Sequence, residues 1–132
     1  MKITIDTNVL VRVLTEDDKQ QSKIAQAEMA RAEVIALAIP ALCELVWVLS
    51  QGYKIPAAQI AEAIRRLIDS ANVVVNRAAA EAGLALLDAG GDFADGAIAY
   101  EGNWLGADTF VSFDKKAVKL MEARGDSARV PG

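Results

Sequence analysis

Short apolar runs that suit β-strands alternate along this chain with longer segments of helical periodicity. The expected strands are residues 3–5, 34–39, 73–75 and 109–113. The expected helices are residues 7–14, 18–32, 40–51, 56–70, 78–88, 92–105 and 115–123. Strands separated by helices need crossover connections, which produce a mainly parallel sheet covered on both faces. We therefore expect an α/β fold.

The length of 132 residues fits a single domain, residues 1–132, because a chain near this size buries roughly two thirds of its unfolded surface. No apolar run approaches the ~20 residues of a membrane-spanning helix, and the N-terminus does not resemble a signal peptide. We therefore expect a cytoplasmic protein with no membrane partner. Only residues 127–132 are expected to be loosely held.

Acidic residues stand where a metal site would need them. Asp6 follows the first expected strand, Glu44 lies in an apolar helix, Asp95 lies early in a later helix, and Asp114 follows the last expected strand. Functional groups of a parallel sheet gather beyond the carboxyl ends of its strands. The chain has no histidine, so a site made of these groups would be all oxygen. Such a site suits a hard cation, Mg2+ or Mn2+.

Most of these acids also have a structural explanation. Asp6 and Asp114 stand between a strand and a helix, where an aspartate is a favoured N-cap that contributes about 1 kcal/mol. Asp92 and Asp95 resemble a capping box. They share one face of a helix, so the sequence leaves open which of them binds a metal directly.

Glu44 fits a structural explanation less well. Its neighbours Leu42, Leu45 and Val46 leave little polar surface on that helix. An unpaired glutamate buried there would face a desolvation penalty of several kcal/mol. A bound cation would remove this penalty, and so would a buried arginine, for which Arg12 is the candidate. We favour the cation.

The net charge of −4 and the pI near 4.8 argue at first against a nucleic-acid partner. The acids of the candidate site account for much of this charge. Without Asp6, Glu44, Asp92, Asp95 and Asp114, 13 of the 18 acids remain against 14 basic residues. Bound cations would also reverse the sign of the site itself.

Four motifs follow one another in a set order and spacing. They are Ile5-Asp6-Thr7-Asn8-Val9-Leu10, Cys43-Glu44-Leu45, Asp92-Phe93-Ala94-Asp95-Gly96-Ala97-Ile98-Ala99 and Ser112-Phe113-Asp114-Lys115-Lys116. Together they resemble the PIN-domain family, specifically the VapC-type toxins of bacterial toxin-antitoxin systems, over essentially the whole chain. The resemblance implies a three-layer α/β/α sandwich with a mainly parallel central sheet. It also implies a Mg2+- or Mn2+-dependent endoribonuclease.

By the same resemblance, the family's acidic quartet corresponds to Asp6, Glu44, Asp95 and Asp114. Thr7, Asn8 and Ser112 take supporting positions, with serine where threonine is commoner, and Asp92 matches a less regular accessory acid. The implied partners are RNA, a second copy of the chain and a cognate antitoxin whose C-terminal segment covers the acidic site.

Basic and aromatic residues supply further candidates. Those for contact with the RNA backbone are Arg12, Lys115, Lys116 and Lys119, although each is individually explained as a solvated surface charge. Those for a protein interface are Trp47, Tyr53, Trp104 and Leu49, although tryptophan and leucine on helices more often belong to the core.

Other acidic-site proteins fit the chain less well. A receiver-type phosphoacceptor needs paired acids after the first strand, where only Asp6 stands, and an aspartyl phosphatase needs Asp-x-Asp where this chain has Asp6-Thr7-Asn8. A non-catalytic PIN-like binding module is the remaining alternative. It would be expected to lose one of the four acids, and all four are present.

Overall fold

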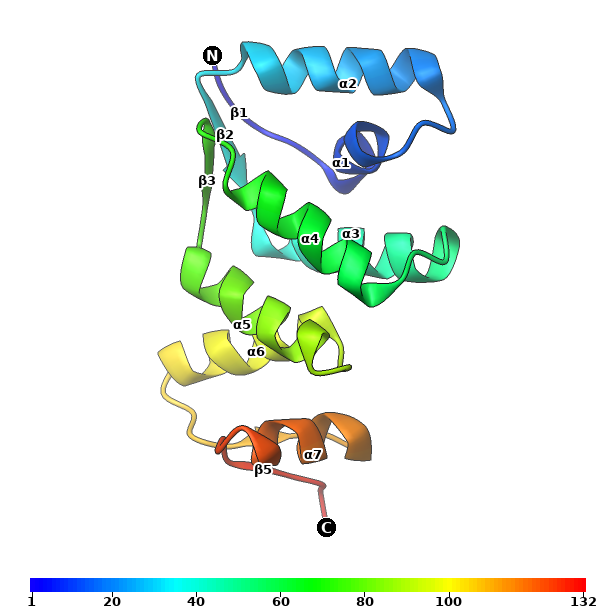
Figure 1. The fold of residues 1–132 in the computed structure, drawn as a ribbon. Helices are drawn as coiled ribbons and strands as arrows, with labels where there is room; N and C mark the ends of the chain where they lie inside the picture. The colour runs from blue at the N-terminus through cyan, green and yellow to red at the C-terminus, as the bar shows by residue number, and fades with distance from the viewer. The chain divides into compact units, whose positions relative to one another are not determined.

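The computed structural model describes all 132 residues. Helices alternate with parallel strands along the chain, so the predicted α/β class is confirmed (Figure 1). The chain divides into two compact units, Met1–Arg77 and Ala78–Gly132. No helix combines the length and the apolar character needed to cross a membrane.

Three parallel strands form the sheet of the first unit, in the order β1-β2-β3. They are β1 (Lys2–Thr4), β2 (Val34–Leu37) and β3 (Val73–Val75), close to the predicted bounds. The register pairs Ile3 with Ile35 and Ile35 with Val73, so these side chains share one face. Ile35 and Leu37 are buried, whereas Ala36 between them is exposed. One face of the sheet therefore packs within this unit.

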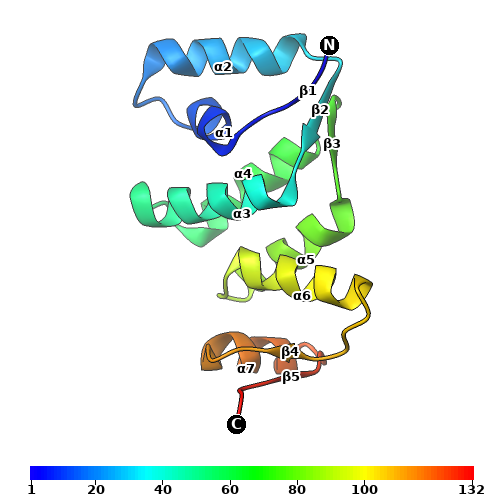
Figure 2. The same cartoon turned by 180° about the vertical axis from the view of Figure 1, so that it is seen from behind.

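Four α-helices and a π-helical turn complete the first unit. They are α1 (Thr7–Leu14), α2 (Lys19–Arg31), α3 (Ile39–Trp47), the turn η1 (Val48–Gly52) and α4 (Ala57–Ile68). Helix α1 packs against both α2 and α3 (Figure 1, Figure 2). The predicted helix 40–51 consists of two elements in the structure, α3 and η1. Its end widens at η1, where the Tyr53 N–H donates to the Val48 carbonyl at 3.3 Å, a π-helical spacing.

The two tryptophans lie at the surface. Trp47 is 64% exposed and Trp104 is 75% exposed, whereas Leu49 is 2% exposed. The expectation that tryptophan and leucine on helices belong to the core is thus correct for Leu49 and wrong for Trp47 and Trp104. On α3 and η1 the buried stripe is taken by Leu45, Val46 and Leu49, so Trp47 is left on the opposite face.

The second unit contains three helices and a two-stranded parallel sheet. Its elements are α5 (Arg77–Asp88, whose first residue belongs to the first unit), α6 (Phe93–Trp104), β4 (Phe110–Val111), α7 (Lys115–Ala123) and β5 (Ala128–Arg129). Strand β4 pairs with β5, with Phe110 opposite Ala128. The predicted strand 109–113 is thus shorter than expected and pairs within its own unit.

The C-terminal residues are more ordered than predicted. Residues 127–132 were expected to be loosely held, but β5 lies among them. The Phe110 N–H donates to the Ser127 carbonyl at 3.0 Å, and the Ser112 N–H donates to the Arg129 carbonyl at 3.1 Å. These bonds also fix the backbone that leads into α7.

Glycines allow α5 and α6 to approach closely. A Cβ added to Gly83 would lie 2.7 Å from the Phe93 ring, and one added to Gly96 would collide with the Ala82 carbonyl. Phe93 is fully buried at the start of α6. The first turn of α6, which carries Asp95, is therefore held tightly against α5.

Candidate functional site

Asp6 and Glu44 line one groove of the first unit. Asp6 lies between β1 and α1 and caps α1, with its Oδ1 accepting the Thr7 N–H at 2.7 Å. The groove has a volume of about 800 Å³. Its other lining residues are Thr7, Asn8, Val9, Val11, Arg12, Gln21, Ile24, Ala25, Glu28 and Val48. The structure therefore brings together two members of the predicted quartet that are distant in sequence.

Thr7 and Asn8 follow Asp6 at the start of α1, and both line this groove. Thr7 is buried, and its hydroxyl donates to the Ala41 carbonyl of α3 at 3.4 Å. This contact connects the start of α1 to the helix that carries Glu44. Asn8 is exposed at the groove and makes no hydrogen bond to either acid.

Glu44 is exposed to solvent, so the desolvation argument made for it from the sequence is wrong. Helix α3 buries Leu42, Leu45 and Val46, and Glu44 points away from that stripe. Arg12 is not its partner either, because the Arg12 guanidinium pairs with Asp17 at 2.7 Å. The Glu44 carboxylate takes part in no hydrogen bond or ion pair.

The second unit holds the other acids, and two of them are helix caps. Asp92 caps α6, with Oδ1 accepting the Ala94 N–H at 3.2 Å. Asp114 caps α7, with Oδ1 accepting the N–H groups of Lys116 and Ala117 at 3.0 and 3.1 Å. The predicted N-caps at Asp6, Asp92 and Asp114 are thus confirmed. Each cap uses Oδ1 alone, so Oδ2 keeps its lone pairs for another ligand.

Asp95 lies in the first turn of α6 and caps nothing. Its pKa is raised above the ordinary value, first by burial and then by the negative charges of Asp92 and Asp114. These three carboxylates of the second unit are therefore close enough to repel one another. A cation among them would relieve that repulsion and lower the pKa of Asp95 again.

Ser112 shapes the loop between β4 and α7. Its Oγ accepts the Asp114 N–H at 3.0 Å, so the hydroxyl orients the backbone of Asp114 and not its carboxylate. Lys115, Lys116 and Lys119 are exposed along α7. This helix thus begins with a carboxylate and carries three solvated cations.

The profile of the PIN domain matches residues 3–121 of the chain. The chain belongs to the PIN-domain family. This PIN domain has no match among curated protein sequences. PIN domains are generally nucleases that use divalent metal ions. Membership therefore agrees with the nuclease class expected from the sequence.

The donor atoms of this PIN domain fit a hard cation. The acids supply only oxygen ligands, and none of the five carboxylates at positions 6, 44, 92, 95 and 114 is in an ion pair. No three His, Cys, Asp or Glu side chains are grouped closely enough to hold a metal ion. The acids instead form a pair along the groove of the first unit, Asp6 with Glu44, and a looser trio in the second, where Asp92 and Asp114 each lie near Asp95.

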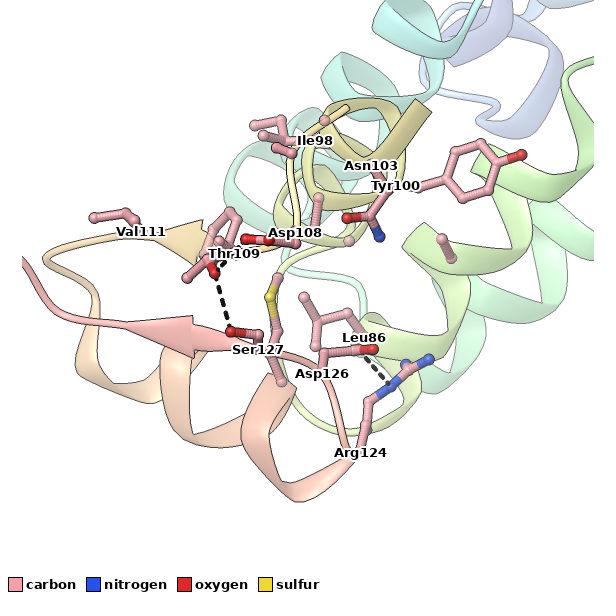
Figure 3. Close-up of a pocket in the computed structure, with 17 residues that line it drawn as sticks. Leu86, Ile98, Tyr100, Asn103, Asp108, Thr109, Val111, Arg124, Asp126 and Ser127 are labelled. Atoms are coloured by element: carbon pink, nitrogen blue, oxygen red, sulfur yellow. Dashed lines mark hydrogen bonds and ion pairs between the residues drawn. The ribbon is translucent and has the colours of Figure 1, made fainter. Parts of the chain in front are cut away.

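The second unit also contains a cavity between α5, α6 and the strands β4 and β5 (Figure 3). It has a volume of about 460 Å³ and is lined by apolar groups such as Leu86 and Met121. At its edge the hydroxyls of Thr109 and Ser127 are 3.1 Å apart. None of the trio lines this cavity, so its size alone does not mark the acidic site.

No pattern in the sequence predicts the contact between Asp17 and Tyr53 beside the groove, and Tyr53 was selected only as a candidate for a protein interface. The Tyr53 hydroxyl donates to Asp17 Oδ2 at 2.7 Å across 36 positions of the chain. A contact over that distance leaves no periodic pattern in the sequence. Arg12 lines the groove and bonds to Asp17, so this network adjoins the candidate site.

Proposed function

We propose that this PIN domain is a divalent-metal-dependent endoribonuclease that hydrolyses RNA phosphodiester bonds. The observation that carries the proposal is the set of five carboxylates without an ion-pair partner. In a structural role, acids that raise the pKa of a neighbour, as Asp92 and Asp114 do for Asp95, would be expected to recruit lysine or arginine. A nuclease instead keeps them free for cations.

Within this proposal, Asp6, Glu44, Asp95 and Asp114 hold Mg2+ or Mn2+. A divalent cation stabilises charge on the phosphate and acidifies water at neutral pH. Asp95 or Asp6 orients the attacking water. Asp92 is the accessory acid. Supporting positions fall to Thr7, Asn8 and Ser112.

RNA would be held through its phosphates. The exposed cations of α7, Lys115, Lys116 and Lys119, adjoin Asp114 in sequence, and Arg12 lines the groove of Asp6 and Glu44. Contacts of this kind position the backbone without reading its sequence. The acidic net charge then limits binding to the surfaces where these cations gather.

The resemblance to VapC-type toxins extends the proposal to a biological role. We propose that the chain acts in the cytoplasm as the toxin of a toxin-antitoxin pair, forms a homodimer, and is inhibited by an antitoxin segment over the acidic site. Co-expression with the protein encoded next to it tests this role. A stable complex that no longer cleaves RNA is the expected result.

Cleavage of total cellular RNA tests the enzymatic proposal. The purified chain should cut RNA with Mn2+ and not with EDTA, and Asp95→Asn should lower the rate by at least about 100-fold because a metal-binding oxygen is lost. Glu101→Gln, on the exposed part of the same helix, is the matched control and should cut normally. Mapping the new RNA ends then identifies the cleavage site.

The same assay separates the alternatives. RNA binding without cleavage would support the non-catalytic PIN-like module. Equal cleavage by wild type and Asp95→Asn would identify a contaminating nuclease. A receiver or phosphatase is set aside by the match to the PIN domain.

A further inference from the structure

Asp17 gathers three hydrogen-bond donors from separate parts of the first unit. Its Oδ1 accepts from Arg12 Nη1 at 2.7 Å and from the Thr15 hydroxyl at 3.0 Å. Its Oδ2 accepts from the Tyr53 hydroxyl at 2.7 Å. The loop after α1 is thereby fastened to the turn after η1. Such a carboxylate is held in one orientation, since both of its oxygens are engaged.

Arg12 is fixed from two sides by this arrangement. Its Nη1 donates to Asp17, and its Nε donates to Gln21 at 2.8 Å. A guanidinium has five N–H donors, so three stay without a partner in the structure. Arg12 and Gln21 both line the groove that contains Asp6. The groove is therefore lined both by an acid and by an immobilised cation with unused donors.

Asp17 also determines which acid Arg12 neutralises. The pKa of Asp17 is lowered to about 2, first by the hydrogen bond from Tyr53, so Asp17 is charged throughout the physiological range. The pKa of Arg12 is raised, first by its hydrogen bond to Asp17. Arg12 stays with Asp17, and Glu44 in the same groove stays without an ion pair.

We infer that Asp17 and Tyr53 are positioning residues that hold Arg12 against the groove wall, where its free N–H groups contact an RNA phosphate beside Asp6 and Glu44. This inference rests on the proposed action on RNA. Guanidinium groups suit phosphate because their N–H donors match two oxygens at once. The ion pair with Asp17 fixes the orientation of the Arg12 guanidinium before RNA binds.

A purely structural role for the network makes a different prediction. If Asp17, Tyr53 and Arg12 only fasten helices together, their removal lowers the melting temperature and leaves the salt dependence of RNA binding unchanged. If Arg12 contacts a phosphate, its removal also changes the number of counterions released on binding.

The test measures binding of a labelled single-stranded oligoribonucleotide in EDTA, by fluorescence anisotropy, across a series of KCl concentrations. We expect Arg12→Gln to lower the slope of log K against log [KCl] by about 0.7, the value for one phosphate contact on a single strand. Arg66→Gln is the matched control, since Arg66 pairs with Glu62 on α4 and lies outside the groove. It should keep the wild-type slope.

A second set of variants tests positioning. Tyr53→Phe removes one hydrogen bond and no charge, and we expect it to weaken RNA binding by about threefold. In the Asp17→Asn background, Arg12→Gln should change the slope by less than it does in wild type, because the two residues act as a unit. Tyr53→Phe keeps the proposal testable if the Arg12→Gln chain does not fold.

An Arg12→Gln slope equal to that of wild type, with a lower melting temperature, would overturn the inference and leave the nuclease proposal intact. So would normal RNA affinity in Tyr53→Phe. RNA binding that responds as expected, in a wild type that does not cleave with Mn2+, would instead overturn the nuclease proposal alone. A wild type that neither binds RNA in EDTA nor cleaves it with Mn2+ would overturn both.

Discussion

Asp17 shows how one residue links local hydrogen bonding to stability. Its pKa falls from 3.8 to about 2, first because Tyr53 donates to it and then because Thr15 and Arg12 do, against the opposing effect of burial. The folded chain therefore binds this proton more weakly than the unfolded chain does. Asp17 thus contributes stability above its unfolded pKa, and this contribution is lost as the pH falls through its folded pKa.

Thermal melts at several pH values test this linkage with Asp17→Asn. The difference in melting temperature between wild type and the variant should be constant above about pH 4 and should shrink between about pH 4 and pH 2. The effect is small, since the Asp17 side chain is half exposed. Tyr53→Phe keeps the carboxylate and should move this window to higher pH. A difference that does not vary with pH would refute the assignment.

The caps at Asp6, Asp92 and Asp114 were predictable from sequence because capping is a local property of a strand-to-helix junction. The orientation of Glu44 was not predictable. Helix α3 is apolar at most positions, so its periodicity does not specify which face is buried. The contacts of α3 with α1 decide that, and they place Glu44 in the groove.

Among the elements, α5 and α6 depend most on residue size. Gly96 lies against the Ala82 backbone, whereas Gly102, on the same helix, has open space around its Cβ position. The same substitution at these two sites therefore has opposite consequences. Steric overlap dominates at Gly96, and helix propensity dominates at Gly102.

Urea unfolding of two alanine variants tests this contrast. Gly96→Ala should lower the free energy of unfolding by about 1–3 kcal/mol through overpacking. Gly102→Ala should raise it by roughly 0.5 kcal/mol, because alanine restricts the unfolded chain and favours helix. Equal effects at the two positions would show that α5 and α6 are not in close contact.

Helices and central strands were predictable because each carries its periodicity within one segment. Helix α4, for example, repeats Ile60, Ile64, Leu67 and Ile68 on one face. Strand β5 was missed because the two residues Ala128–Arg129 are too short for an alternating pattern. Its existence depends on pairing with β4, a contact that the local sequence does not encode.

At the scale of the whole molecule, acidic charge without counter-charge is the dominant property. The net charge is −4, and the pair and the trio of candidate carboxylates lie outside every ion pair. Sequence motifs identified these acids as one set. The structure places Asp6 with Glu44 and Asp95 with Asp92 and Asp114. That these acids bind Mg2+ or Mn2+ is part of our proposal.

Thermal denaturation with Mg2+ or Mn2+ tests whether these acids bind a cation. At a cation concentration ten times Kd, binding to the native state adds about 1.4 kcal/mol, which corresponds to a rise of roughly 3–6 °C in melting temperature for a chain of this size. Asp6→Asn should remove most of this rise. Glu16→Gln, an exposed acid outside the groove, should retain it. A flat response in wild type would favour the non-catalytic module.

The caps have a consequence for the genetics of this chain. Alanine alleles at Asp6, Asp92 and Asp114 remove a helix N-cap as well as a carboxylate. A loss-of-function phenotype from such an allele therefore does not distinguish a less stable, less abundant protein from one that has lost a metal-binding group. Asparagine alleles at the same codons keep an oxygen that can accept the backbone N–H. Glu44 and Asp95 cap no helix. Alleles at these two positions therefore change the candidate metal site without removing a cap.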